Sequence, residues 1–296
     1  MLSTSLSRGG DYADIFLEDT VIRGIELQDG LVSQALQTHL YGAGIRVLYG
    51  EQTGYAYTTD LTMPSMLFAA SFAASLGQHG QNRVEPHINA QDGMSVPEGK
   101  ESLSRKPVYV MPPQEVRGTL LQINEAAHAS DPRVVRVKAS LNQRLQRVLL
   151  INSQGEQFTE ERPRTTLFVH VVMEQEGQTQ MGVASRMMQM GAEMLTPALV
   201  QEIISEAVSR AAFLFGASRV EGGETPVVMA SGASGILLHE AIGHAFEADF
   251  VRQGTSIFAG RLGQTICSPD ITIVDDGTQP GDAGRLTWDD EGCPGK

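Results

Sequence analysis

Two histidines and one glutamate stand close together in the segment GILLHEAIGHAFEADF at 235–250. Imidazole nitrogens are common zinc ligands, and a carboxylate beside them can accept a proton from water. His239, Glu240 and His244 follow the pattern H-E-x-x-x-H, which is one residue longer than the H-E-x-x-H helix of many zinc metalloproteases. The pattern alone leaves two interpretations open, a metal site on a distorted helix or an ordinary helix that carries two histidines.

The five-residue spacing sets a geometric condition for a shared metal ion. On an ideal α-helix the two imidazoles would point about 140° apart, because each residue turns the chain by about 100°. A local widening to i→i+5 hydrogen bonding, as in the π-type bulges found at functional sites, would return them to one face. We expect Gly243, directly before His244, to absorb this distortion. Glu240 would then act as the general base toward a zinc-activated water.

A third zinc ligand is not evident from the sequence. Catalytic zinc usually has three protein ligands and one open position. Glu247 and Asp249 are candidates because they are near in sequence, whereas Cys267 and Cys293 are candidates because thiolates are soft ligands. The residue types therefore leave the third ligand open.

The rest of the chain must position this segment. Period and turn signals predict helices at 62–77, 113–130 and 196–216, and strands at 12–19, 21–28, 44–58, 134–141, 147–155 and 165–175. Asp29-Gly30 predicts a turn, and the polar stretch 78–106, with His79 and His87, predicts a long surface loop. Before the histidine helix, which we expect to begin near Gly235, residues 226–230 predict a short buried strand.

These elements predict an α/β (α+β) fold in two domains. Residues 1–216 are expected to form an N-terminal α/β domain of mixed or antiparallel strands covered by helices. The polar, glycine-bearing stretch ASRVEGGET marks a boundary. Residues 222–296 are expected to begin a β-rich C-terminal domain, incomplete here, that carries the zinc helix and a strand starting at ITIVDD.

Composition excludes some classes of protein. The net charge of −13 argues against a nucleic-acid binder, which normally shows a basic patch. Two cysteines cannot build a disulfide framework, so a reducing cytosol is expected. The N-terminus lacks a signal-peptide core, and the apolar stretch at 66–77 is too short to span a bilayer. The sequence therefore predicts a soluble, cytoplasmic protein without membrane or nucleic-acid partners.

The segment 235–292, GILLHEAIGHAFEADFVRQGTSIFAGRLGQ…ITIVDDGTQPGDAGRLTWDDEG, resembles the signature region of the TldD/PmbA metalloprotease family. YADIFLED and DPRVVRVKASL are similar to the family's N-terminal half, in the same order. Because H-E-x-x-x-H is retained, the resemblance is to the TldD branch; the TldE (PmbA) branch lacks the motif and provides a non-catalytic partner.

This resemblance implies a zinc metallopeptidase subunit that cleaves small or unfolded peptides. His239 and His244 would be zinc ligands and Glu240 the general base, with a TldE/PmbA-like partner or a homo-oligomer completing the assembly. The family's third ligand is a cysteine farther downstream, so the sequence resembles a truncated member. The alternatives are a non-catalytic assembly subunit and an inactive fragment.

Overall fold

The computed structural model describes residues 1–77, 108–232, 234–279 and 283–295. The predicted loop at 78–106, with His79 and His87, lies outside the described residues. The chain divides into two compact units. Unit 1 comprises Met1–Ala217 and Asp276–Lys296, and unit 2 comprises Ser218–Asp275. The predicted domain boundary between 216 and 222 stays a prediction.

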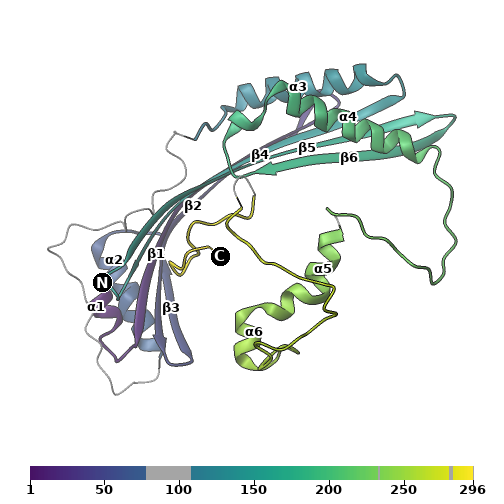
Figure 1. The fold of residues 1–296 in the computed structure, drawn as a ribbon. Helices are drawn as coiled ribbons and strands as arrows, with labels where there is room; N and C mark the ends of the chain where they lie inside the picture. Colours follow the sequence, from purple (N-terminus) through teal and green to yellow (C-terminus); the bar gives the residue numbers. More distant parts are fainter. Residues whose placement is uncertain (78–107, 233, 280–282, 296) are drawn as a thin grey trace. The chain divides into compact units, whose positions relative to one another are not determined.

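Unit 1 is built on one six-stranded antiparallel sheet with the order β3-β2-β1-β4-β5-β6 (Figure 1). The strands are β1 (Tyr12–Gln28), β2 (Leu31–Tyr49), β3 (Gln52–Thr58), β4 (Val134–Asn152), β5 (Gln157–Gln175) and β6 (Gln178–Met188). The mixed α/β class with antiparallel strands is confirmed. All neighbouring strands pair antiparallel, so short turns can join β1 to β2, β2 to β3, β4 to β5 and β5 to β6. The connection from β3 to β4 is long and contains α2 and α3.

Several strands are longer than the sequence patterns predict. The predicted strands 12–19 and 21–28 are one strand, β1, and the predicted run 44–58 is divided between β2 and β3 by a turn at Gly50, whose φ is 56°. The turn at Asp29-Gly30 is confirmed. Gln28 pairs with Leu31 across it, and φ is 49° at Asp29 and 79° at Gly30, as a type I′ hairpin requires.

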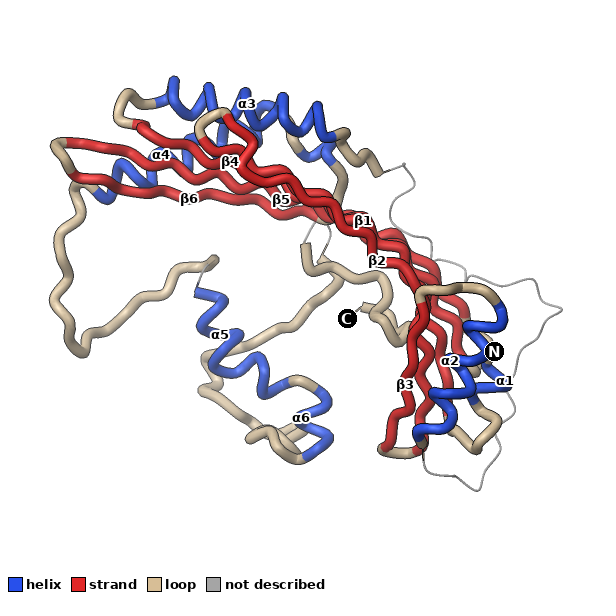
Figure 2. The backbone as a smooth tube through the Cα atoms, turned by 180° about the vertical axis from the view of Figure 1, so that it is seen from behind, coloured by secondary structure: helices blue, strands red, loops and turns tan. Residues whose placement is uncertain are grey.

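Four helices cover one face of the sheet at its two ends (Figure 2). They are α1 (Leu2–Ser5), α2 (Met63–Leu76), α3 (Pro113–Ser130) and α4 (Pro197–Leu214). Helices α1 and α2 pack over Ile15 and Ile45, whereas α3 and α4 pack over Leu141 and Leu167. Ile15 and Leu27 of β1 lie an even number of residues apart, so both hydrophobic cores lie on the same face.

The described part of 276–296 packs on the opposite face. Trp288 is buried with Leu150 and Phe158, and its carbonyl oxygen accepts a hydrogen bond of 2.8 Å from Arg162 Nη2. Arg162 also pairs with Asp290, at 2.6 Å, and with Glu160. This face therefore holds a smaller core that joins the end of the described chain to the central strands.

Unit 2 contains α5 (Ser234–Ile242), a 3₁₀ turn η2 (Gly243–Phe246) and α6 (Ala248–Gln253). Among its described residues none is buried and none forms a strand. The strand predictions at 226–230 and ITIVDD are therefore wrong for this structure. Neither stretch has a pairing partner among the described residues, and a strand needs a neighbour to satisfy its backbone groups. In the described part of the chain, no helix has the length and apolar content to cross a bilayer.

Candidate metal centre

The H-E-x-x-x-H segment lies across the junction between α5 and η2. His239 and Glu240 lie in the last turn of α5, and His244 lies in the 3₁₀ turn that follows. Ile242 departs from helical geometry, with φ −137° and ψ −25°, and Gly243 has no positive φ. The predicted π-type bulge at Gly243 is therefore wrong: the α-helix ends one residue earlier and continues as a tighter turn.

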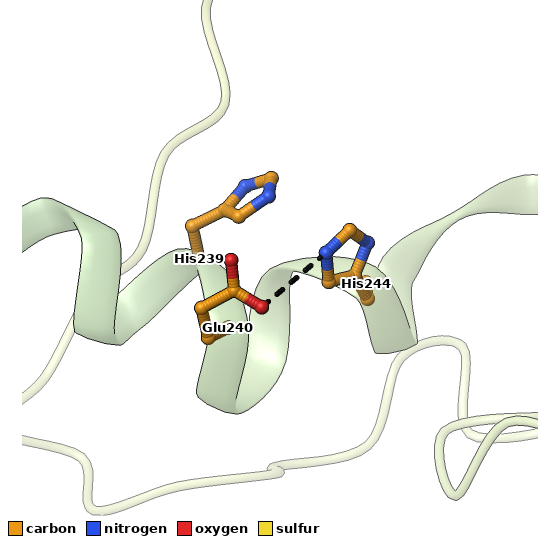
Figure 3. Close-up of side chains that lie close together, drawn as sticks. All are labelled: His239, Glu240 and His244. Atoms are coloured by element: carbon orange, nitrogen blue, oxygen red, sulfur yellow. Dashed lines mark ion pairs between the residues drawn. The ribbon is translucent and has the colours of Figure 1, made fainter.

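This break brings the two imidazoles together. Their ring centroids lie 4.4 Å apart at an interplanar angle of 66°. Figure 3 shows His239, Glu240 and His244 on one side of the junction, with the Glu240 carboxylate facing His244 at 3.7 Å from Oε2 to Nε2. One ligand atom from each of the three residues lies within 4.8 Å of the others. The divergence expected on a regular helix does not occur.

Glu247 orients the second histidine. Its Oε1 accepts a hydrogen bond of 2.7 Å from His244 Nδ1, which leaves Nε2 for a metal or a proton. This hydrogen bond and the charges of Glu247 and Glu240 raise the pKa of His244 above its usual range. Because this pKa is raised, protons compete with a metal ion for the His244 ring up to a higher pH. A carboxylate on the far nitrogen is also the usual outer partner of a metal-bound histidine.

Short-range contacts hold η2 in place. Ser256 Oγ donates a 2.5 Å hydrogen bond to the carbonyl oxygen of Ala245, and the rings of Phe246 and Phe258 stack at 4.5 Å. Gly254 ends α6 in the left-handed region, with φ 74°, which lets the chain turn back. Unit 2 thus positions His244 through contacts within about a dozen residues of it, as far as the chain is described.

Of the predicted third ligands, the three in unit 2, Glu247, Asp249 and Cys267, do not join this group. In unit 2, Glu247 acts on His244 Nδ1, and the thiol of Cys267 lies 3.6 Å from the carbonyl oxygen of Ile271. Asp249 Oδ1 accepts from the backbone N–H of Phe250. Within the described residues the group consists of His239, Glu240 and His244, all exposed. The orienting part of Glu247 was missed at the sequence level, although its i+3 spacing from His244 could have indicated it.

Comparison with known proteins identifies the family. Three family models match in chain order: PmbA/TldA metallopeptidase domain 1 at residues 13–76, the central domain at 106–212 and the C-terminal domain at 222–296. The chain therefore belongs to the PmbA/TldD family of metallopeptidases. The expected resemblance is confirmed, and with it a family-level metallopeptidase assignment.

Comparison with individual relatives supports the same family assignment. The chain is 31% identical to the metalloprotease TldD homolog of Haemophilus influenzae over 97% of this chain and 60% of that protein. It is 28% identical to the homolog of Buchnera aphidicola subsp. Schizaphis graminum, with the same coverage. The fold is similar to that of TldE from Thermococcus kodakarensis, with a TM-score of 0.72 at 18% identity over 98% of this chain and 64% of that one. The chain spans about 60% of the length of these curated relatives.

Proposed function

We propose that this chain is a zinc-dependent metallopeptidase subunit that hydrolyses small or unfolded peptides. The observation that carries the proposal is the approach of the His239 and His244 rings to 4.4 Å despite their five-residue spacing. Family membership supports a metal-dependent peptidase, and the relatives are named metalloproteases.

The donor set fits zinc. The imidazoles of His239 and His244 have ligand nitrogens within 4.8 Å of each other, and zinc accepts imidazole nitrogen as a donor. The Glu240 carboxylate, in the same group, lies close enough to act on a water beside the ion. His239 and His244 would hold the ion, with Glu247 fixing the ring of His244 through Nδ1. When bound, zinc would lower the pKa of a water molecule toward ~7 and polarise the peptide carbonyl group.

Glu240 is assigned the proton transfers. Its carboxylate would take a proton from the attacking water as the water oxygen bonds to the carbonyl carbon, and would deliver that proton to the leaving amine as the C–N bond breaks. The carboxylate is exposed and lies 3.7 Å from His244 Nε2, so it is close to the ligand nitrogen and accessible to solvent. General acid–base catalysis of this kind contributes about 10²–10⁴-fold to the rate.

Zinc content and peptide hydrolysis, measured on the same preparations, test the proposal. For the full-length protein we expect about one zinc ion per chain, with most of it lost in His239→Ala and His244→Ala. Glu240→Gln is expected to keep zinc while hydrolysis of an unstructured fluorogenic peptide falls about 10²–10⁴-fold. His39→Ala is the matched control because His39 is an exposed histidine of unit 1 that pairs with Asp19. Equal zinc in all variants would contradict the proposal.

We also propose that the chain associates with a TldE/PmbA-like subunit or with a second copy of itself, in the cytoplasm. Large apolar side chains of unit 2 support this, since Val228 is 98% exposed and Leu237 58%. Exposed apolar surface of this kind favours association. Light scattering measures the mass of the assembly for the chain alone and for the chain mixed with such a subunit. Unchanged function of the complex in His239→Ala would favour the alternative of a non-catalytic assembly subunit.

A further inference from the structure

A second candidate site lies in unit 1, at the edge of the sheet beside the start of α3. A cavity of about 240 Å³ opens there between β1, β2, β4 and α3. Its apolar walls include Ile25, Leu36, Val116 and Leu141. This volume is below the ~300–1,000 Å³ typical of pockets for drug-sized ligands, which favours a small occupant.

Three polar side chains form a row across the strands at this cavity. Arg23 of β1 pairs in register with Gln37 of β2 on one side and with Gln143 of β4 on the other. Directly opposed residues of neighbouring strands point to the same face, so all three lie on one side of the sheet. Leu141, two residues from Gln143, belongs to the core under α3, which places the row on the helix-covered face.

Two members of the row have unsatisfied polar groups. Gln143 is 4% exposed, and neither its Nε2 nor its Oε1 has a hydrogen-bond partner among the described residues. The buried Nε of Arg23 has none either. A buried polar group without a hydrogen-bond partner destabilises the folded protein. A ligand that supplies acceptors here would form the hydrogen bonds that these buried groups lack in the unbound protein, and this would favour binding.

The Arg23 guanidinium sets the charge that this cavity favours. Pro113 and Val116, at the start of α3, add apolar wall. The N–H groups of Glu115 and Val116 already donate to the carbonyl oxygen of Pro112, and Pro113 has no N–H. The guanidinium therefore favours an anion, whereas the walls favour an apolar group.

We propose that this cavity binds a carboxylate carried by a small apolar group. The carboxylate would accept hydrogen bonds from Arg23 and, after rotation of the Gln143 side chain into the cavity, from its amide. Either a free apolar acid or the C-terminus of a peptide presents this chemistry. The strand edge is compatible with the second source, because residues 31–42 of β2 have only β1 as a pairing neighbour in the described chain.

Calorimetric titration of the full chain with N-acetyl-leucine tests this site, and N-acetyl-leucinamide is the uncharged control. We expect saturable binding of the acid and at least about tenfold weaker binding of the amide, because charge-assisted hydrogen bonds are lost. An acetylated tetrapeptide that ends in leucine separates the two sources. Tighter binding of the tetrapeptide indicates a peptide C-terminus, and equal binding indicates a free acid.

Variants of Arg23 and Gln143 test whether the acid binds at the row of polar side chains. Arg23→Gln and Gln143→Leu are expected to weaken binding of the acid by about tenfold or more. Gln143→Leu removes an unsatisfied amide, so its unfolding free energy should be unchanged or higher, which separates lost binding from lost folding. Arg144→Gln is the matched control, because Arg144 points to the other face and lies 3.9 Å from Glu18. Equal binding of acid and amide, or unchanged binding in Arg23→Gln, would overturn the proposal.

Discussion

The two units of this chain stabilise their structures in different ways. Unit 1 has a continuous sheet with helices packed over it, and side chains such as Leu120, Leu167 and Ile203 are fully buried. Unit 2 has no buried residue in its described part, although it carries the three side chains of the candidate metal centre. Its longest helix, α5, has nine residues, and isolated helices shorter than about 12–15 residues are marginal in water.

The candidate metal centre therefore depends on local backbone geometry and not on a hydrophobic core. The break at Ile242 and the contacts of Ser256 and Phe258 determine where His244 lies. A metal ion that binds His239 and His244 would stabilise the folded form of this segment, because metal binding and folding are coupled. The segment has few other stabilising contacts. Four measurements test this contrast between the two units.

The largest expected effect contrasts matched leucines in the two units. Leu167→Ala removes a fully buried side chain and is expected to cost about 2–5 kcal/mol in the free energy of unfolding. Leu237→Ala removes a side chain that is 58% exposed and should change it by no more than about 0.5 kcal/mol. Urea unfolding followed by circular dichroism measures both. Similar losses in the two variants would show that unit 2 also has a core.

A smaller effect is expected at the residue that orients His244. Glu247→Gln removes the carboxylate that accepts from Nδ1 and should weaken zinc binding by about 10-fold, within the ~10–100-fold range for such outer partners. The control is Glu221→Gln, an exposed glutamate in the same unit. Competition with a zinc chelator measures the affinities. Unchanged zinc affinity in Glu247→Gln would show that this hydrogen bond does not orient the His244 ring for zinc binding.

The N-terminus of α4 offers a test confined to unit 1. Thr196 Oγ1 accepts a hydrogen bond of 3.3 Å from the backbone N–H of Leu199, and Thr196→Ala should cost about 1 kcal/mol in unfolding free energy. Thr196→Ser keeps the acceptor and serves as the control. If the two units are energetically separate, zinc affinity stays the same in both variants; a parallel loss of zinc affinity would show coupling between them.

The smallest expected effect is a pH dependence of unit 1. Hydrogen bonds from Arg133 lower the pKa of Asp131 from its usual 3.8 to about 2. The charged form is therefore favoured in the folded protein, so this stabilisation is complete above the unfolded pKa and is lost as the pH falls from about 4 through about 2. Unfolding free energies of wild type and Asp131→Asn should converge over that interval. A constant difference across it would contradict the assignment.

Local patterns predicted the helices well. The helix at 113–130 was predicted with the bounds of α3, and Thr196 and Pro197 marked the start of α4. Strand β6 was missed, since its segment Gln178–Met188 has few β-branched residues and is stabilised by pairing with β5. The strands predicted at 226–230 and ITIVDD were wrong because composition favours extended chain but cannot supply a partner strand.

The sequence was sufficient to predict the family, the starts of α3 and α4 and the residues of the H-E-x-x-x-H group. Sheet pairing explains why β1 and β4 run unbroken through their polar centres, because two neighbouring strands satisfy their backbone groups throughout. Only the tertiary structure decided how His239 and His244 meet, through a helix that ends at Ile242. Periodicity is a property of one segment, whereas the direction of a side chain after a break depends on the contacts that hold the next turn.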